Sequence, residues 1–336
     1  MTRIAVDAMS GDHGHAVAVD AALSCLHKHA ELAITLVGDE QALSQTLDER
    51  RDVPGERITV HNATEVVDMC ELPAKSLRNK KDSSMRVAIN LVQSGAADAC
   101  VSAGNTGALM ATARFVLKTL TGIDRPAIVS PIPSTNGDTL MLDLGANTDS
   151  DAEQLFQFAV MGSVLAETVY QQQTPRVGLL NIGAEEFKGN PQIQEAGRLL
   201  AETDLNYIGF VEGDDIYVGD VDVVVCDGFV GNVALKTSEG LGKLIGQYLQ
   251  EEFSRNLFSR MAALCAWRVL KSFRHRVDPR HYNGATFAGL QGTVVKSHGN
   301  ADAVAFATAI ESARMEVEKD VPERIRQLLA RNLGED

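Results

Sequence analysis

The amino-acid sequence lacks several features that would assign a protein to a class at once. Its five cysteines are scattered over 336 residues and form no C-x-x-C pair, so the sequence indicates neither a disulfide framework nor a zinc site. No stretch approaches the roughly 18 uncharged apolar residues that a bilayer-spanning helix needs. The N-terminus has an acidic residue by position 7 and no uninterrupted apolar region, unlike a signal peptide. We therefore expect a cytoplasmic protein with reduced cysteines and no bound metal or cofactor.

Basic residues are also in short supply. The chain has 31 Lys and Arg residues against 45 Asp and Glu residues, and its net charge of −14 argues against a general nucleic-acid-binding protein. The charge is uneven, because the stretch from Arg255 to Arg280 holds seven basic residues and a single acidic one, Asp278. An acidic protein with one basic island is expected to meet a partner or a membrane surface there.

Short β-rich runs alternate with helical patterns along most of the chain. Several of the runs are continuously apolar, as expected for strands covered on both faces of a sheet. The pattern predicts one α/β domain over residues 1–336 with a largely parallel sheet. We expect strands at 3–8, 32–37, 57–61, 98–102, 127–132, 139–144, 177–182, 207–211 and 221–226, and helices at 16–30, 83–94, 107–119, 151–170, 192–203, 230–251, 300–317 and 322–332. Residues 285–290 and 292–297 flank a tight turn and predict a hairpin added to this core.

Two of the strand-to-helix junctions share one pattern. Residues 97–107 (ADACVSAGNTG) align without gaps with residues 221–231 (VDVVVCDGFVG), and each stretch has Asp in second position and a G-x-x-G that opens a helix. Two βα units with ordinary turn chemistry would give the same pattern. Taken together, the two junctions suggest a site at the carboxyl end of one sheet, where open α/β folds bind ligands.

A glycine-rich turn into a helix exposes free backbone N–H groups and the positive end of the helix dipole, which suits an anion. The sequence has no G-x-x-x-x-G-K-[ST], and Gly240, Gly242 and Gly246 miss the G-x-G-x-x-G spacing, so the usual nucleotide motifs are absent. A small anion such as phosphate is therefore the expected ligand of the first junction. The residues that we expect to hold it are Ser102, Gly104, Asn105, Thr106 and Gly107.

Two further side chains are candidates for catalysis. Lys188 lies in the loop GAEEFKGN after the strand at 177–182. It can place a cation over a phosphate or a developing oxyanion, or it is a solvated lysine paired with Glu185 or Glu186. Asn232, just after the second junction, either donates a hydrogen bond to a carbonyl oxygen or caps its helix.

Four side chains are candidates for contact with the substrate. Asp7 and His13 lie in the loop DAMSGDHG at the end of the first strand, where they either shape the site or only form a turn. Lys296 and His298 precede the helix at 300–317, where they either contact the ligand or only pack and cap.

Seven stretches carry a resemblance to a known family. They are DAMSGDHG (7–14), SSMRVA (83–88), VSAGNTGALM (101–110), DLGAN (143–147), NIGAEEFKGN (181–190), VVCDGFVGN (224–232) and NGATFAGLQGTVVKSHG (283–299). In order and spacing they resemble the PlsX family of phosphate acyltransferases, over nearly the whole chain. The sequence departs from the residues common in the family at Ser10, His15 and Ala184, where Gly, Pro and Glu are usual.

The resemblance implies a three-layer α/β/α sandwich with an isocitrate/isopropylmalate-dehydrogenase-like fold related to the phosphotransacetylases. It also implies a homodimer and peripheral association with the inner face of the cell membrane. The implied reaction is conversion of acyl-[acyl carrier protein] and inorganic phosphate into acyl phosphate and free acyl carrier protein. A membrane-bound glycerol-3-phosphate acyltransferase is then expected to use the acyl phosphate in phospholipid synthesis. The alternatives are an acyltransferase that uses coenzyme A thioesters and a non-catalytic, membrane-associated scaffold.

Inorganic phosphate needs no base to become a nucleophile, because its dianion is abundant near neutral pH. It needs confinement beside the thioester and relief from charge repulsion. We expect the loop at 102–107 to hold phosphate, and Lys188 and Asn232 to stabilise the tetrahedral oxyanion. A covalent route through Cys226 is disfavoured, because Asp222 and Asp227 flank this residue and raise the pKa of its thiol.

The basic island coincides with an amphipathic stretch, FSRNLFSRMAALCAWRVLKSFRHR (253–276), for which we expect a helix over 254–275 in a segment at 253–280 that protrudes from the domain. One interpretation is a helix packed at a dimer interface. The favoured interpretation is contact with an anionic bilayer, through the residues Leu257, Leu264, Trp267, Arg268 and Lys271. Docking of an acidic carrier protein, with basic residues 78, 80 and 81 taking part, is a third.

Overall fold

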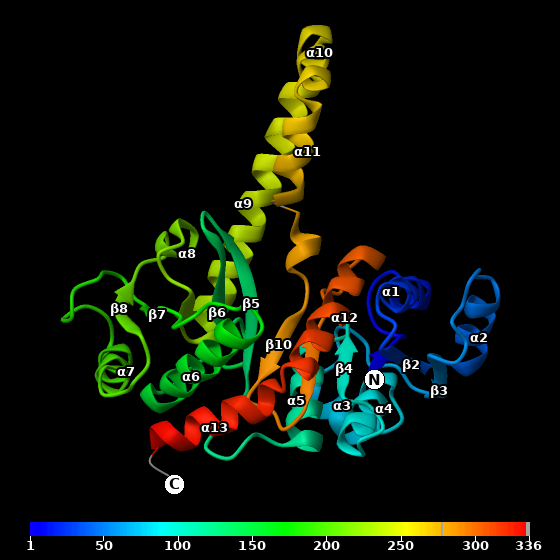
Figure 1. Ribbon diagram of the computed structural model, residues 1–336, viewed down its shortest axis with the longest axis horizontal. Helices are drawn as coiled ribbons and strands as arrows, with labels where there is room; N and C mark the ends of the chain where they lie inside the picture. The colour runs from blue at the N-terminus through cyan, green and yellow to red at the C-terminus, as the bar shows by residue number, and fades with distance from the viewer. Residues whose placement is uncertain (277, 334–336) are drawn as a thin grey trace.

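The computed structural model describes residues 1–276 and 278–333, and over these residues it shows one sheet of eleven strands with helices on both faces (Figure 1). The strands are β1 (Thr2–Asp7), β2 (Leu32–Gly38), β3 (Ile58–Asn62), β4 (Ala99–Ser102), β5 (Ala127–Ser134), β6 (Gly137–Leu142), β7 (Val177–Leu180), β8 (Tyr207–Val211), β9 (Val223–Val225), β10 (Ala285–Ala288) and β11 (Thr293–Lys296). The helices are α1 (His15–Lys28), α2 (Glu40–Asp48), α3 (Pro73–Asn79), α4 (Ser84–Gln93), α5 (Thr106–Leu117), α6 (Ala152–Thr168), α7 (Pro191–Ala201), α8 (Asp215–Val218), α9 (Gly228–Ser254), α10 (Leu257–Cys265), α11 (Trp267–Arg276), η1 (Pro279–Tyr282), α12 (Ala303–Glu318) and α13 (Val321–Leu333). The predicted α/β/α sandwich is confirmed.

Strand directions divide the sheet into two halves. The order is β3-β2-β1-β4-β11-β10-β5-β6-β9-β7-β8, and most neighbours are parallel. The exceptions are β10, which is antiparallel to β11 and β5, and the β5–β6 pair. As a result, β1 to β4 and β11 run one way, while β6 to β9 run the other. The junctions after β4 and β9 therefore lie at opposite ends of the sheet, and the expectation that they share one end is wrong.

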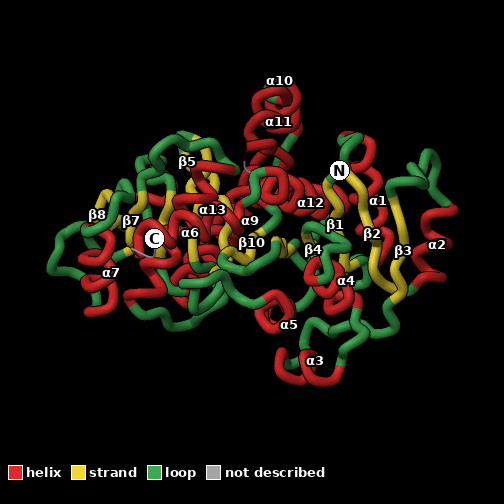
Figure 2. Tube along the Cα trace, turned by 60° about the horizontal axis from the view of Figure 1, so that its bottom comes forward, coloured by secondary structure: helices red, strands yellow, loops and turns green. Residues whose placement is uncertain are grey.

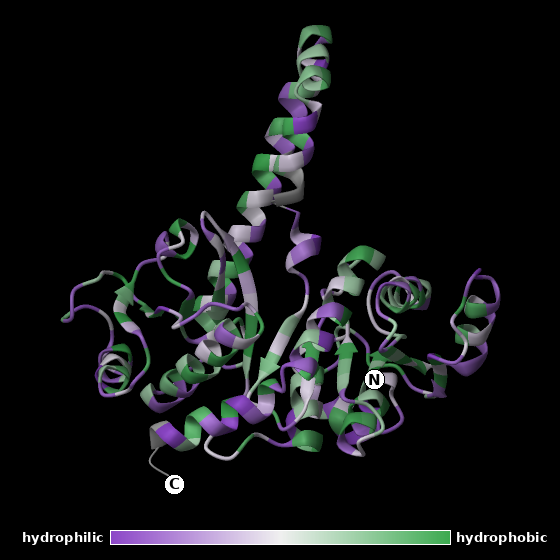
Figure 3. Cartoon of the chain, in the orientation of Figure 1, coloured by the Kyte–Doolittle hydropathy of each residue, from purple (hydrophilic) through white to green (hydrophobic). Residues whose placement is uncertain are grey.

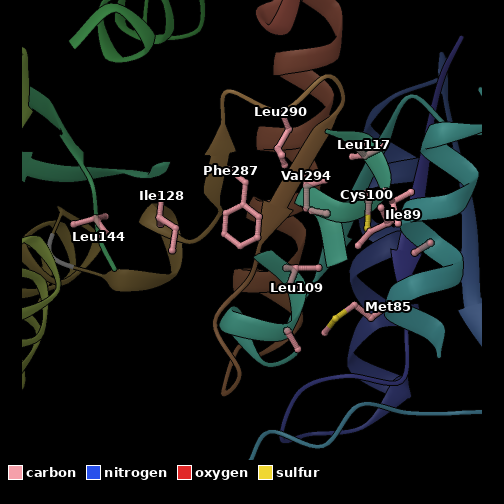
Figure 4. Close-up of a cluster of buried hydrophobic side chains, with 14 of the residues drawn as sticks. Met85, Ile89, Cys100, Leu109, Leu117, Ile128, Leu144, Phe287, Leu290 and Val294 are labelled. Carbon is pink, nitrogen blue, oxygen red and sulfur yellow. The ribbon is translucent and has the colours of Figure 1, made fainter. Parts of the chain in front are cut away.

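The predicted C-terminal hairpin forms at the centre of the sheet. β11 continues the parallel order after β4, in a register that sets Lys296 beside Ser102, and β10 turns back to pair with β5. Buried side chains of the hairpin, among them Phe287 and Val294, pack in one cluster with residues of both halves, such as Leu109 and Leu144 (Figure 4). The hairpin is therefore the element that joins the halves.

Helices cover the sheet according to the alternation of side chains along its strands. Ile4 and Val6 of β1 belong to a core cluster with α1 and α12, whereas Ala5 belongs to the cluster with α4 and α5 on the other face (Figure 2). In the second half, α6, α7 and α13 pack in one cluster with β6, β7 and β9. As predicted, α7 begins at Pro191 after the cap Asn190.

One helical segment leaves the body of the protein. α9 runs outward, α10 packs against it at the tip, and α11 returns toward the sheet, so the protrusion is a helical hairpin (Figure 1). The prediction of one helix over 254–275 is wrong, because Asn256 caps α10 and Ala266 ends it. Hydrophobic residues recur along the protrusion (Figure 3), and the side chains of Leu257, Leu264 and Trp267 are exposed. Within residues 1–276 and 278–333, no helix has the length and apolar character needed to cross a membrane.

Candidate active site

The first candidate group lies where β4 passes into α5. Asn105 caps the helix, because its Oδ1 accepts a hydrogen bond from the N–H of Ala108 at 2.9 Å. Its Nδ2 donates to two carbonyls of the loop at 69–71, at 2.6 and 3.2 Å, so both ends of this side chain are engaged. Thr106 and Gly107 are exposed, and their backbone N–H groups have no partner among the described residues. These two amides and the Thr106 hydroxyl remain open to an anion.

Ser102 is turned away from solvent. Its side chain is fully buried, and its hydroxyl donates to Oδ2 of Asp7 at 2.6 Å. The Ser102 Oγ also accepts a hydrogen bond from the N–H of Gly104 at 3.1 Å, and it lies 3.2 Å from the Ser10 Oγ. These contacts tie the loop after β1 to the loop after β4. Ser102 and Gly104 thus shape the loop, and their contact with phosphate stays a prediction.

Asp7 and Lys296 are the buried charged residues of this group. Oδ1 of Asp7 is buried without a hydrogen-bond partner among the described residues, and burial raises the pKa of this carboxyl, while the Ser102 hydroxyl opposes the rise. Lys296 ends β11 and donates through Nζ to the carbonyls of Ala103, at 3.3 Å, and Ser297. Burial lowers the pKa of Lys296 to about 8, against the opposing effect of the Asp7 charge. A nearly buried cation therefore lies beside the loop that leads to α5.

The two histidines of this group lie on the surface. His13 and His298 are both exposed, at the turns that follow β1 and β11. The two turns are tied together, because the N–H of Asp12 donates to the carbonyl of Gly299 at 2.7 Å. The structure thus brings both histidines to the end of the sheet where Asp7 and Lys296 lie.

The second candidate group lies at the opposite end of the sheet, after β6 and β9. The Asp143 carboxylate accepts hydrogen bonds from the N–H groups of Ala146 and Asn147 in its own loop, at 3.0 and 2.7 Å. The carbonyl of Asn147 accepts a hydrogen bond from the N–H of Gly228, the first residue of α9, at 2.7 Å. The start of α9 is therefore fixed against the Asp143 loop.

Asn232 belongs to the second turn of α9. It does not cap the helix, because Asp227 does so by accepting hydrogen bonds from the first-turn N–H groups. The Asn232 side chain is exposed and lies over Gly145, where an added Cβ would come 3.4 Å from the Asn232 Cβ. It makes no hydrogen bond with the described residues, so its amide is open to a ligand.

Lys188 follows β7, a parallel neighbour of β9, and so shares this end of the sheet with Asn232. Its Nζ lies 2.8 Å from the Glu185 carboxylate, which raises the pKa of the lysine and keeps it cationic. In the structure Lys188 thus forms the ion pair with Glu185 that the sequence analysis gave as the alternative. No hydrogen bond or ion pair of the described residues joins Lys188 or Asn232 to the loop at 102–107.

α9 is the element that approaches both groups. It starts on the Asp143 loop and carries Lys236 one turn after Asn232. Besides burial, the charge of Lys236 lowers the pKa of Lys296 and of His298, which places this helix beside the first group as well. Ligand bound along α9 can therefore meet residues from both ends of the sheet.

Cys226 lies directly after β9 and is buried. Burial raises the pKa of its thiol well above the usual value, and the charges of Asp143 and Asp227 add to the rise. The thiol therefore stays protonated and is a poor nucleophile, as the sequence predicts. The sequence suggested that Asp222 raises the pKa of this thiol, but in the structure Asp143, which is distant in the sequence, has this effect.

Comparison with known proteins identifies the family. Residues 2–324 match the family model described as "Fatty acid synthesis protein". A phosphate acyltransferase from Methylococcus capsulatus is 59% identical over 99% of this chain and 100% of its own length. Another, from Alkalilimnicola ehrlichii, is 60% identical over 97% of this chain and 95% of its own. The chain belongs to this family of phosphate acyltransferases. It is therefore an enzyme, and the resemblance seen in the sequence is confirmed.

Solved structures show the same fold. A phosphotransacetylase from Streptococcus pyogenes superposes with a TM-score of 0.66 at 17% identity, over 94% of each chain. A 4-hydroxythreonine-4-phosphate dehydrogenase from Klebsiella pneumoniae does so with a TM-score of 0.56 at 15% identity, over 94% of this chain and 100% of its own. The expected dehydrogenase-like fold, related to the phosphotransacetylases, is confirmed.

Three residues of these groups were not among the site residues expected from the sequence. Asp143 could have been found, because DLGAN places an acidic residue at the end of a predicted strand and a glycine directly after that strand. Ser10 carries only the signal of a polar residue in a strand-end loop. No sequence pattern marks Lys236 as a site residue, because its proximity to Lys296 depends on the path of α9 through the folded protein.

Proposed function

We propose that this phosphate acyltransferase moves the acyl group of an acyl carrier protein thioester to inorganic phosphate, and releases acyl phosphate and the free carrier protein. The observation that carries the proposal is the pair of backbone amides of Thr106 and Gly107, at the start of α5, which have no hydrogen-bond partner among the described residues. A phosphate there gains two hydrogen bonds and the positive end of the helix dipole. The Lys296 ammonium supplies further positive charge beside the same loop.

The reaction requires no residue that removes a proton from phosphate. A phosphate oxygen attacks the carbonyl carbon of the thioester, the new C–O bond forms, and the carbonyl oxygen becomes an oxyanion. In this proposal the two halves of the sheet close over the substrate, so that Lys188 and Asn232 approach the phosphate at the start of α5 and stabilise this oxyanion, with about 3 kcal/mol for one well-placed donor. The intermediate then collapses, the C–S bond breaks, and the sulfur leaves as a thiolate that takes a proton from water. Confinement of the two reactants supplies several kcal/mol more.

A homodimer completes this proposal. The apolar residues Leu241, Leu244, Ile245, Tyr248 and Leu249 are exposed and recur at helical spacing on α9, the helix that approaches both candidate groups. A second copy of the chain covers this stripe. Light scattering on Ile245→Glu is expected to give the mass of a monomer, whereas an unchanged dimer would remove α9 from the interface.

Peripheral contact with an anionic membrane also belongs to the proposal. The exposed Leu257, Leu264 and Trp267 enter the lipid interface, while Arg268 and Lys271 meet the headgroups. The amphiphilic product is then released next to the membrane-bound glycerol-3-phosphate acyltransferase that consumes it. Leu264→Glu is expected to reduce flotation with anionic liposomes, and unchanged flotation would overturn the contact.

The decisive experiment follows the product directly. The purified protein is incubated with a carrier-protein thioester and phosphate, and acyl phosphate is trapped with hydroxylamine. Lys188→Ala is expected to lower kcat by about 10²–10³, whereas the exposed Lys319→Ala serves as a control with wild-type kcat. Product from a coenzyme A thioester alone would overturn the proposed donor. Wild-type kcat in both Lys188→Ala and Asn232→Ala would remove the roles given to these residues.

A further inference from the structure

Two cations hold an exposed aromatic side chain on the outer face of α4 and α5. The guanidinium carbon of Arg86, in α4, lies 5.1 Å from the centre of the Phe115 ring, and the ammonium of Lys118, at the end of α5, lies 5.0 Å from it. Phe115 nevertheless keeps 53% of its surface exposed. An aromatic side chain fixed in this way loses little further freedom on binding, which is typical of an anchor in a protein interface.

The two helices that carry Phe115 and its cations contain no acidic residues, although the exposed Asp124 lies beside Arg114. The whole chain has 45 acidic residues. Arg86, Arg114 and Lys118 form no ion pair with any described residue. Arg114 donates to the backbone carbonyl of Asp124 at 3.3 Å rather than to a carboxylate. The positive charge of these three side chains is therefore available to a partner.

A surface pocket lies beside Phe115, on the C-terminal half of α5. The pocket has a volume of about 420 Å³ and is lined by Ala111, Arg114, Phe115, Lys118 and Thr119. From there, the uncharged Met110 and Gly107 lead along the accessible side of the helix toward its first turn. At 1.5 Å per residue, Phe115 lies about 14 Å along the helix from Thr106.

We propose that this face of α4 and α5, with Phe115 at its centre, docks the acidic carrier protein whose arm delivers the acyl thioester to the start of α5. The inference rests on the proposed function. The net charge of −14 repels an acidic partner from most of the surface, so unopposed cations direct the encounter. The tip of the protrusion is less suited, because Ser254 lies about 33 Å along α9 from Asn232 at 1.5 Å per residue. The α4–α5 face also lies away from the protrusion (Figure 2).

The test compares two acyl donors. In the variant Arg114→Glu/Lys118→Glu, the KM for the carrier-protein thioester is expected to rise roughly tenfold or more, with kcat retained. The KM for acyl-pantetheine, which has the arm but no carrier protein, is expected to keep its wild-type value. Lys319→Glu is the matched control. Lys319 is an exposed C-cap residue of α12, just as Lys118 is an exposed C-cap residue of α5. In the wild type, added salt should raise the KM for the carrier-protein donor only.

Three results would overturn the docking face. The first is an unchanged KM for the carrier-protein donor, and the second is an equal rise of the KM for acyl-pantetheine. The third is conversion of the variant from a dimer to a monomer in size-exclusion chromatography, because this face would then be an interface between two copies of the chain. Phe115→Ala offers a second variant without a change of charge. Failure of the proposed function is distinct, because the wild type would then make no acyl phosphate from either donor, while fluorescence anisotropy would still report whether the carrier protein binds.

Discussion

At the scale of single residues, the start of α5 separates side chains that shape the loop from those that face outward. Ser102 donates to the Asp7 carboxylate inside the protein, at 2.6 Å, and accepts from the Gly104 amide. Thr106 is exposed, and its amide has no partner within the described part of the chain. The two hydroxyls differ by four positions in the sequence, and substitution of each should affect a different property.

Ser102→Ala is expected to lower the free energy of unfolding by about 1–3 kcal/mol, because the buried Asp7 carboxylate loses a hydrogen bond. Thr106→Ala should keep the stability within about 0.5 kcal/mol of the wild type and raise the KM for phosphate several-fold, because a donor beside the open amides is lost. Urea unfolding and initial rates over a range of phosphate concentrations measure both effects. The assignment would be contradicted if Ser102→Ala kept the wild-type free energy of unfolding and Thr106→Ala kept the wild-type KM for phosphate.

This division was not available from the sequence. VSAGNTG predicts polar groups and free amides at a helix start, and the structure has both. The motif does not say which way each side chain points, because that depends on Asp7 and Ser10, about 90 residues earlier in the sequence. The same limit applies to Lys296, whose place beside Ser102 follows from the pairing of β11 with β4.

At the scale of elements, α9 depends on close approach of its first turn to the Asp143 loop. A Cβ on Gly231 would lie 1.9 Å from the backbone carbonyl oxygen of Asp143, so no side chain fits at this position. On the outer part of the same helix, a Cβ on Gly246 would meet nothing within 4 Å. The two glycines allow the same substitution to be compared with and without displacement of the helix.

Gly231→Ala is expected to shift the start of α9, displace Asn232, and lower both kcat and the free energy of unfolding, the latter by more than about 2 kcal/mol. Gly246→Ala should keep wild-type activity and gain up to about 1 kcal/mol from helix propensity. Thermal unfolding and the hydroxylamine assay test the pair. A Gly231→Ala variant with normal kcat would show that the position of α9 is unimportant for the reaction.

The elements that the sequence predicts are those with strong apolar patterns. β9 is a run of three buried valines, and α6 is buried along nearly its whole length, so both were predictable. The short helices α2, α3 and α8 were not predicted, because they are brief and bury only one or two side chains each. Strand direction was missed for a different reason. It is set by the pairing of β10 with β5, which lie far apart in the sequence, and by the β5–β6 hairpin, whose turn is marked by Asn136-Gly137 but not by the apolar pattern of the strands.

At the scale of the whole molecule, the central hairpin holds a buried acid. Glu316 of α12 is buried, and its carboxyl group accepts a hydrogen bond from the Thr286 hydroxyl of β10. Burial raises the pKa of Glu316 to about 8, and the bond from Thr286 only partly opposes the rise. Because β10 joins the two halves of the sheet, the charge state of this group affects the stability of the whole fold.

The sign of this effect is opposite to that of an ordinary surface carboxylate. The folded protein binds the Glu316 proton more tightly than the unfolded chain, so the contribution to stability is complete at low pH and is lost as pH rises from about 4.5 to about 8. Glu316→Gln keeps a neutral group of similar shape at every pH. The difference in unfolding free energy between wild type and this variant should therefore fall by roughly 1 kcal/mol per pH unit across that range, in urea titrations at pH 5, 6.5 and 8. Glu318→Gln, exposed on the same helix, should follow the wild type, and a Glu316→Gln curve parallel to both would show that Glu316 is ionised throughout.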